Sequence, residues 1–203
     1  MKKGINSLQL KCICIGLMLA GVCLQQVFYN IGYLIYLSAF PLAAFLLTEA
    51  ARKTSDRKRL LLRLLTVALL LEIPWDIVIF GLSEWKNWGL SQNYLFTLCV
   101  ALGVLMTVDA TGKKVAPGTM GNTLTTLGIY LVGAFATVLL RTEQSCIGVL
   151  MVVALYLFRE NKILSLLSVA ALYLLFVKRL TGLEFVPAFS ILLTWLYDGG
   201  QET

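Results

Sequence analysis

The sequence predicts an all-α membrane protein of about eight helices, with six or seven also possible. Its 203 residues are 59% hydrophobic and 14% charged, and the mean hydropathy is +0.83. An average soluble domain carries about 25% charged residues. Apolar runs of roughly 20 residues recur along the chain, and each is long enough to cross a bilayer as a helix. A β-barrel is not expected, because barrel strands alternate polar and apolar residues.

The apolar runs set the expected helix boundaries. They predict helices over 8–29, 31–51, 60–81, 93–108, 122–140, 144–158, 163–177 and 183–197. The sixth and seventh runs are short for full spans, so they are either buried among their neighbours or divided differently. The first run is too long for a signal peptide and lacks a small-x-small cleavage site, which favours a retained helix. No repeat or long loop is evident, and we expect one domain over 1–203.

The net charge of +6 does not indicate nucleic-acid binding, because the basic residues lie mainly in loops between apolar runs. Placing the amino terminus in the cytoplasm puts eleven of the loop residues inside and four outside, of which Lys178 and Arg179 fit this orientation least well. The other two outside are Lys86 and Arg141. Trp85 and Trp88 suit a membrane–water boundary. The five cysteines lie within apolar runs, and the chain has no histidine, so we predict no metal site.

The third apolar run contains the least expected residues. It reads Glu72-Ile73-Pro74-Trp75-Asp76, and its two carboxylates share a helix face four residues apart. A carboxylate inside a membrane is costly unless it faces a cavity or a partner. Two interpretations remain open. Glu72 and Asp76 take part in proton transfer, or they are bonded to neighbouring helices.

A second polar group follows at Gln92, Asn93 and Thr97. Asn93 and Thr97 are one helical turn apart at the start of the fourth run. We expect them to hydrogen-bond Asp76 across the loop and to hold helices three and four together, because polar contacts commonly join membrane helices.

Six basic residues fall between positions 52 and 63, against one acid, Asp56. The positive-inside rule alone explains such a cluster. The alternative is a cytoplasmic site for the phosphates of a nucleotide-like cofactor, because Arg and Lys donors match phosphate oxygens.

Several of these motifs resemble the TraX family, membrane proteins named for a pilin N-acetyltransferase of conjugative plasmids. Ala39-Phe40-Pro41-Leu42 leading to Glu49 is similar to the family's Ala-Phe-Pro segment followed by a Glu. Glu72-Ile73-Pro74-Trp75-Asp76 is similar to its Glu-Ile-Pro-Phe-Asp, and Gln92-Asn93-Tyr94-Leu95-Phe96-Thr97-Leu98 to its Gln-Asn-hydrophobic-Phe-Thr-Leu. The resemblance extends nearly from end to end.

The departures concern chemistry. Where the family usually has Asp-His in its first helix, this chain has Gly21-Val22, and Lys53 replaces a His after the Glu. Thr142-Glu143-Gln144-Ser145 stands where the family has Thr-Asp-Tyr-Gly. Acetyl transfer to an amine needs a base, and His is the commonest choice.

The resemblance implies an acetyl-CoA-dependent N-acetyltransferase in the bacterial cytoplasmic membrane, acting on pilin, another small membrane protein or a small amine. Glu72 and Asp76 would then be the catalytic carboxylates. The phosphates would bind four basic residues, and four polar residues would line the pocket. The expected phosphate-binding residues are Arg57, Lys58, Arg59 and Arg63, and the expected pocket residues are Glu49, Gln92, Asn93 and Thr97. The alternative is a non-catalytic membrane protein that keeps the fold and binds a partner helix or lipid.

Overall fold

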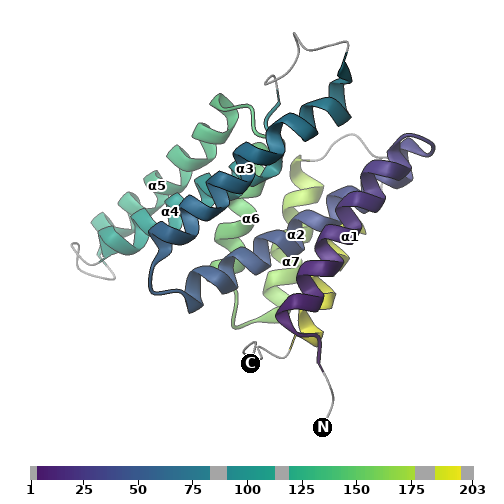
Figure 1. Ribbon diagram of the computed structural model, residues 1–203. Coiled ribbons are helices and arrows are strands. Elements are labelled where there is room, and N and C mark those ends of the chain that lie inside the picture. Colours follow the sequence, from purple (N-terminus) through teal and green to yellow (C-terminus); the bar gives the residue numbers. More distant parts are fainter. Residues whose placement is uncertain (1–3, 83–90, 113–118, 177–185, 198–203) are drawn as a thin grey trace. The chain divides into compact units, whose positions relative to one another are not determined.

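The computed structural model describes residues 4–82, 91–112, 119–176 and 186–197, and within them the chain forms eight helical elements (Figure 1). The all-α prediction is confirmed. The elements are α1 (Ser7–Gln25), α2 (Tyr29–Lys53), α3 (Arg57–Phe80), α4 (Tyr94–Gly112), α5 (Met120–Leu139), α6 (Ser145–Leu157), α7 (Lys162–Phe176) and the 3₁₀ helix η2 (Val186–Leu196). Two predictions fall outside the described residues. They are the membrane-boundary role of Trp85 and Trp88 and the exterior position of Lys178 and Arg179.

Four helices, α1, α2, α4 and α5, are long and apolar enough to cross a membrane, whereas α6, α7 and η2 are shorter. On α5 the two faces differ sharply. Gly133 and Ala134 are buried, while Leu131, Val132 and Phe135 are at least 60% exposed. Large apolar side chains exposed in this way suit contact with lipid chains, so the helices are those of a membrane protein. The number of spans and the side of the amino terminus remain predictions.

The chain divides into two compact units, which we describe separately. Unit 1 comprises Met1–Ala50 and Ala154–Thr203, and unit 2 comprises Ala51–Val153. Unit 1 therefore holds α1, most of α2, α7 and η2. Unit 2 holds α3, α4, α5 and most of α6.

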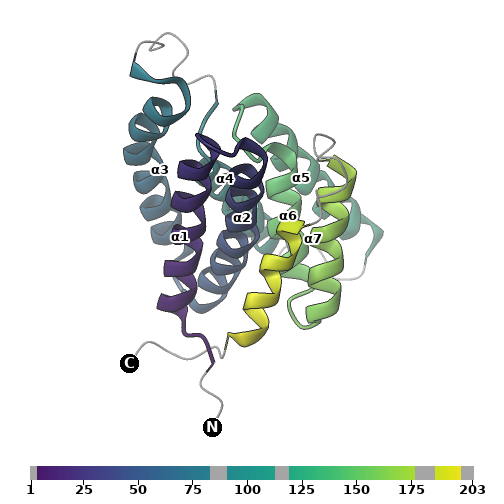
Figure 2. The same cartoon turned by 90° about the vertical axis from the view of Figure 1, so that its right-hand side faces the viewer.

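In unit 1, α1 and α2 form a hairpin whose core includes Leu10, Cys14, Ala39 and Leu42. Gly21 allows the two helices to approach closely. A Cβ atom at Gly21 would lie 2.5 Å from the backbone nitrogen of Tyr36, closer than real Cβ contacts allow. Small residues commonly mark such close helix crossings in membranes. The 3₁₀ helix η2 packs against α7 in the same unit (Figure 2).

Pro41 lies inside α2 and cannot donate to the carbonyl of Leu37, four residues earlier. The phenol of Tyr173, on α7, donates to that carbonyl over 2.9 Å. Tyr173 is fully buried. Because a buried carbonyl without a donor is costly, this hydroxyl compensates for the bond that proline removes.

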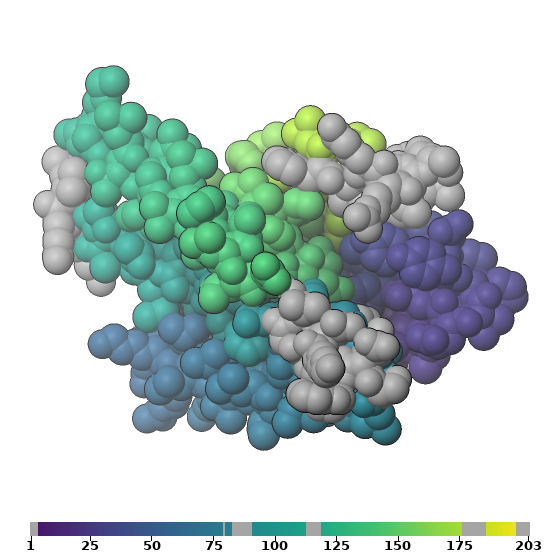
Figure 3. Space-filling view, turned by 90° about the horizontal axis from the view of Figure 1, so that it is seen from above, coloured from purple at the N-terminus to yellow at the C-terminus, as the bar shows by residue number. Residues whose placement is uncertain are grey.

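Unit 2 is built around α4, which packs against α3 on one side and α5 on the other. Figure 3 shows the three helices as one contiguous block, coloured from blue to green. Leu98, Leu102 and Leu105 of α4 are almost fully buried. Gly133 of α5 faces Val104, since a Cβ atom there would lie 2.1 Å from a Val104 methyl group. This packing of α3, α4 and α5 positions the polar residues Glu72, Asn93 and Thr97.

The Pro41–Tyr173 relationship predicts a coupled effect on stability. Tyr173→Phe removes the donor to the Leu37 carbonyl, and we expect unfolding free energy to fall by about 1–3 kcal/mol. In a Pro41→Ala background the alanine N–H can bond that carbonyl, so the cost should shrink. Equilibrium unfolding in detergent, followed by circular dichroism, measures both. Tyr29→Phe removes an exposed hydroxyl as the control, and an equal cost in both backgrounds would contradict the coupling.

Candidate functional site

Glu72 and Asn93 join α3 to α4. The Glu72 carboxylate accepts from the Asn93 side-chain amide at 2.6 Å and from the Asn93 backbone N–H at 3.2 Å. The same amide donates to the carbonyl of Ala68 at 2.9 Å. Asn93 is 4% exposed. A residue inside α3 and the residue directly before α4 therefore fix the pairing of the two helices.

Asn93 also starts α4, because its side-chain oxygen accepts from the backbone N–H of Leu95 at 3.0 Å. All three Asn93 donors, two on the amide and one on the backbone, are thus directed to Glu72 and Ala68. The prediction that Asn93 bonds Asp76 was wrong. Glu72, one turn earlier on α3, is the carboxylate within reach. Asp76 itself is 4% exposed.

Thr97 was also expected to bond Asp76, and this too was wrong. Its hydroxyl donates to the Thr142 hydroxyl at 2.8 Å, and a hydroxyl has only one proton to give. Gln92 supports the same connection, since its backbone N–H donates to Arg141 and its carbonyl accepts from Glu143. The start of α4 is therefore fastened to the turn between α5 and α6.

That turn has an unusual backbone. Arg141 and Ser145 have φ angles of 52° and 45°, in a region that residues other than glycine rarely adopt. The hydrogen bonds at Gln92, Thr97 and Thr142 hold it in place. Thr142 was not predicted as a site residue, because a single threonine in a short polar loop carries no distinctive signal.

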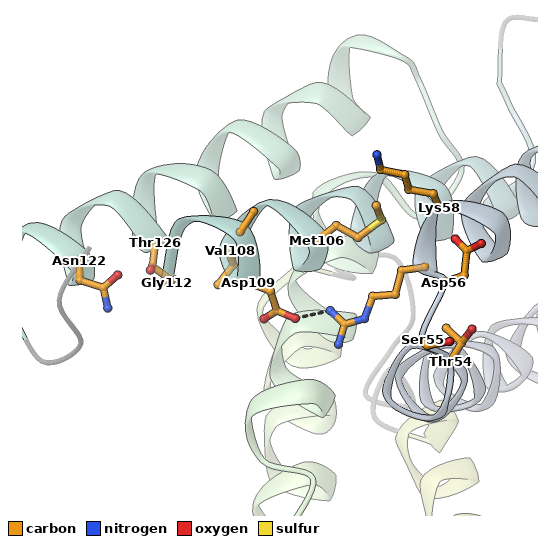
Figure 4. Close-up of a pocket in the computed structure, with 12 residues that line it drawn as sticks. Thr54, Ser55, Asp56, Lys58, Met106, Val108, Asp109, Gly112, Asn122 and Thr126 are labelled. Carbon is orange, nitrogen blue, oxygen red and sulfur yellow. Dashed lines mark hydrogen bonds and ion pairs between the residues drawn. The ribbon is translucent and has the colours of Figure 1, made fainter. Parts of the chain in front are cut away.

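A second feature of unit 2 is an open groove of about 880 Å³ at the amino-terminal end of α3, here called the α3 groove. Figure 4 shows Thr54 and Ser55 at one end and Asn122 and Thr126 of α5 at the other. Arg57 and Lys58 of α3 line it, with the acids Asp56 and Asp109. The remaining lining residues are Met106, Val108, Ala110 and Gly112.

Arg57 pairs with Asp109 of α4, and Figure 4 marks this contact to Asp109 with a dashed line. Its Nε–H also donates to the carbonyl of Ala51 at 2.7 Å. Asp56 caps α3 by accepting from the backbone N–H of Arg59 at 3.0 Å. Both acids of the groove are therefore engaged. The role of Asp109 was missed, although a lone carboxylate after an apolar run was the available signal.

The predicted phosphate-binding residues separate into two pairs. Arg57 and Lys58 line the α3 groove, whereas Arg59 and Arg63 do not. Arg59 lies 3.6 Å from Asp56, and its side chain is 71% exposed. Arg59 and Arg63 are four residues apart, so they share another face of α3. Two of the four expected residues thus come together.

Glu49 lies in unit 1, where it lines a different cavity with Arg159 and Lys162. It is thus in a different compact unit from Gln92, Asn93 and Thr97. The parts of the chain that the structure describes contain no group of three His, Cys, Asp or Glu residues placed to hold a metal ion.

The Glu72–Asn93 contact yields a stability prediction. Asn93→Ala removes the amide that bonds Glu72 and Ala68 and the cap of α4, so unfolding free energy should fall by about 1–3 kcal/mol. Gln92→Ala is the matched control, because the contacts described for Gln92 use backbone atoms. Unfolding in detergent measures both variants. Equal stability of the two would show that the amide does not hold the hairpin.

No curated protein and no solved structure matches the chain. The family model described as TraX protein matches residues 7–197, nearly the whole chain. The match includes both the Glu72–Asn93 contact and the α3 groove. The chain therefore belongs to the TraX protein family.

Proposed function

We propose that this protein is a membrane acetyltransferase that takes the acetyl group from acetyl-CoA and transfers it to an amine. The acceptor is an amino group on pilin, another small membrane protein or a small molecule. The proposed location is the bacterial cytoplasmic membrane, with the amino terminus and the α3 groove on the cytoplasmic side. The observation that supports it most is the α3 groove with its basic side chains, in a chain of the TraX family.

The size and donors of the α3 groove fit the phosphates of coenzyme A. Its volume of about 880 Å³ lies within the range of roughly 300–1,000 Å³ that ligand pockets occupy. Lys58 offers an ammonium group, and Thr54 and Ser55 offer hydroxyls. The backbone N–H groups at the start of α3 favour anions. Arg57 and Asp56 hold the groove in shape through Asp109, Ala51 and Arg59.

Glu72 is the proposed base. It lies 15 residues beyond Arg57 on the same helix, or about 22 Å at 1.5 Å per residue. Coenzyme A is an elongated molecule whose thioester is far from its phosphates, so a separation of this kind is compatible with one bound molecule. Glu72 would take the proton that the amine loses as its nitrogen bonds to the acetyl carbon and the carbon–sulfur bond breaks.

Asn93 and Asp76 would assist Glu72. Asn93 donates two hydrogen bonds to the Glu72 carboxylate and fixes its position. Asp76 is buried one turn further along the helix, where a second carboxylate can orient an ammonium group. In this proposal the two acids replace the histidine base that the chain lacks.

A second candidate function is non-catalytic binding of a partner helix or lipid by the same fold. The Glu72–Asn93 contact favours it, because a carboxylate that joins two helices need not take part in chemistry. The absence of histidine from the sequence points the same way.

Binding of acetyl-CoA tests the first proposal. A ligand at 100 times its dissociation constant adds about 2.7 kcal/mol to the native state, so the detergent-solubilised protein should melt at a higher temperature with acetyl-CoA than with acetate or ATP. Lys58→Ala should reduce this shift. Arg63→Ala removes the same charge from the same helix outside the α3 groove. No shift at saturating acetyl-CoA, or equal losses in both variants, would reject the groove as the cofactor site.

Glu72→Gln separates the two candidate functions. Glutamine keeps an oxygen that accepts from Asn93 but cannot take a proton. For an enzyme, we expect folding to be preserved and transfer of labelled acetyl groups in membranes to fall by about 10²–10⁴-fold. Glu160→Gln, an exposed position, is the control. Full activity in the Glu72 variant would exclude it as the base, and loss of folding would assign it to the helix contact.

A further inference from the structure

Unit 1 contains a cavity that the proposed transferase reaction does not use. It has a volume of about 260 Å³ and is lined by residues from four helical segments, and we call it the unit 1 cavity. Its lining residues are Phe45, Glu49, Leu155, Arg159, Lys162, Ser165, Ile191, Thr194, Trp195 and Tyr197.

Two cations are held at the cavity by neighbouring groups. The guanidinium of Arg159 lies 5.3 Å from the centre of the Tyr156 ring, and its Nε–H donates to Glu160 at 3.0 Å. The ammonium of Lys162 donates to the carbonyl of Trp195 at 3.2 Å. Arginine has five N–H donors and lysine three, so these contacts leave donor capacity for an anionic group such as phosphate.

Three further polar side chains of the cavity, Glu49, Ser165 and Thr194, can accept hydrogen bonds. The Ser165 hydroxyl donates to the carbonyl of Phe158 at 2.9 Å, and the Thr194 hydroxyl donates to that of Ile191 at 2.6 Å. Both hydroxyl protons are therefore used, and the oxygens retain lone pairs. Each side chain is buried, at 8% exposure. With the carboxylate of Glu49, they form an acceptor set suited to an ammonium group.

An apolar wall accompanies these charges. Phe45 packs edge-on against Tyr197, with ring centres 5.7 Å apart, and both rings belong to the packing around the α1–α2 core. Leu155 and Ile191 are also buried. The neighbouring Leu157 and Leu196 are more than half exposed, as expected beside lipid chains. A cavity of this size is smaller than most sites for drug-sized ligands, so it suits a headgroup rather than a nucleotide.

We propose that the unit 1 cavity binds an amino-phosphate group, a primary ammonium joined to a phosphate by a short linker, carried by the phospholipid phosphatidylethanolamine. Arg159 and Lys162 hold the phosphate. Glu49, Thr194 and Ser165 receive the three N–H donors of the ammonium. Basic residues at membrane helix ends commonly meet lipid headgroups, and the exposed apolar residues beside the cavity favour a lipid over a soluble amino-phosphate.

The test uses the purified full-length chain in detergent and native mass spectrometry. The probes are phosphatidylethanolamine, phosphatidylglycerol and phosphatidylcholine with identical acyl chains, and free phosphoethanolamine. We expect phosphatidylethanolamine to bind about tenfold more tightly than the other two, since only its headgroup donates N–H bonds to an acidic acceptor. Equal affinity for the three lipids would overturn the proposal. Equally tight binding of phosphoethanolamine would keep the recognised group but reject the lipid as its carrier.

Variants then locate the binding. Glu49→Gln should abolish the preference for phosphatidylethanolamine, and Arg159→Gln with Lys162→Gln should weaken all three lipids by about tenfold. The matched controls are Glu143→Gln for the acid, and Lys11→Gln with Arg63→Gln for the two cations, which remove the same charges outside the cavity. An unchanged preference in Glu49→Gln would overturn the assignment. If the double variant does not fold, stepwise N-methylation of the lipid tests the wild type, where affinity must fall as N–H donors are lost.

Discussion

The structure depends on satisfying backbone and side-chain polar groups where water is scarce. Inside a bilayer an unsatisfied carbonyl costs several kcal/mol, so each departure from regular helix needs a compensating partner. Pro41 shows how strict this is, because the carbonyl that it leaves without a helical donor receives one from Tyr173 on another helix. The proline thus affects the packing of α7 as well as the course of α2.

The same constraint explains the α3–α4 hairpin. An amide and a carboxylate facing each other can satisfy several donors and acceptors at once, and Asn93 does so while also capping its own helix. The Glu72 carboxylate, which Asn93 holds in place, suits either of two roles. It can keep a catalytic carboxylate in one orientation, or it can simply join two helices. The same Glu72–Asn93 contact serves both roles, which differ only in whether Glu72 exchanges a proton.

Much of the fold could be predicted from the sequence. Apolar runs and charged loops located the helices to within a few residues, and α3 begins three residues earlier than expected because Asp56 caps it. The contacts were harder. Residues four apart share a helix face, but this spacing does not say which of Glu72 and Asp76 meets α4. The pair Arg57–Asp109 joins positions 52 residues apart, and no local pattern indicates it. Glu49 was grouped with Asn93 by family motif, which carries no information about the compact unit that holds each residue.

The glycine at the α1–α2 crossing bears on how this chain differs from its family. The resemblance described above implies an acid where this chain has Gly21, and the backbone of Tyr36 lies where any side chain at that position would start. Even alanine at this position would force the two helices apart. An acid at this position would therefore require α1 and α2 to move apart. Because the blocking atoms are the backbone nitrogen, Cα and Cβ of Tyr36, shortening the Tyr36 side chain would not make room, and the crossing of the two helices itself sets the limit.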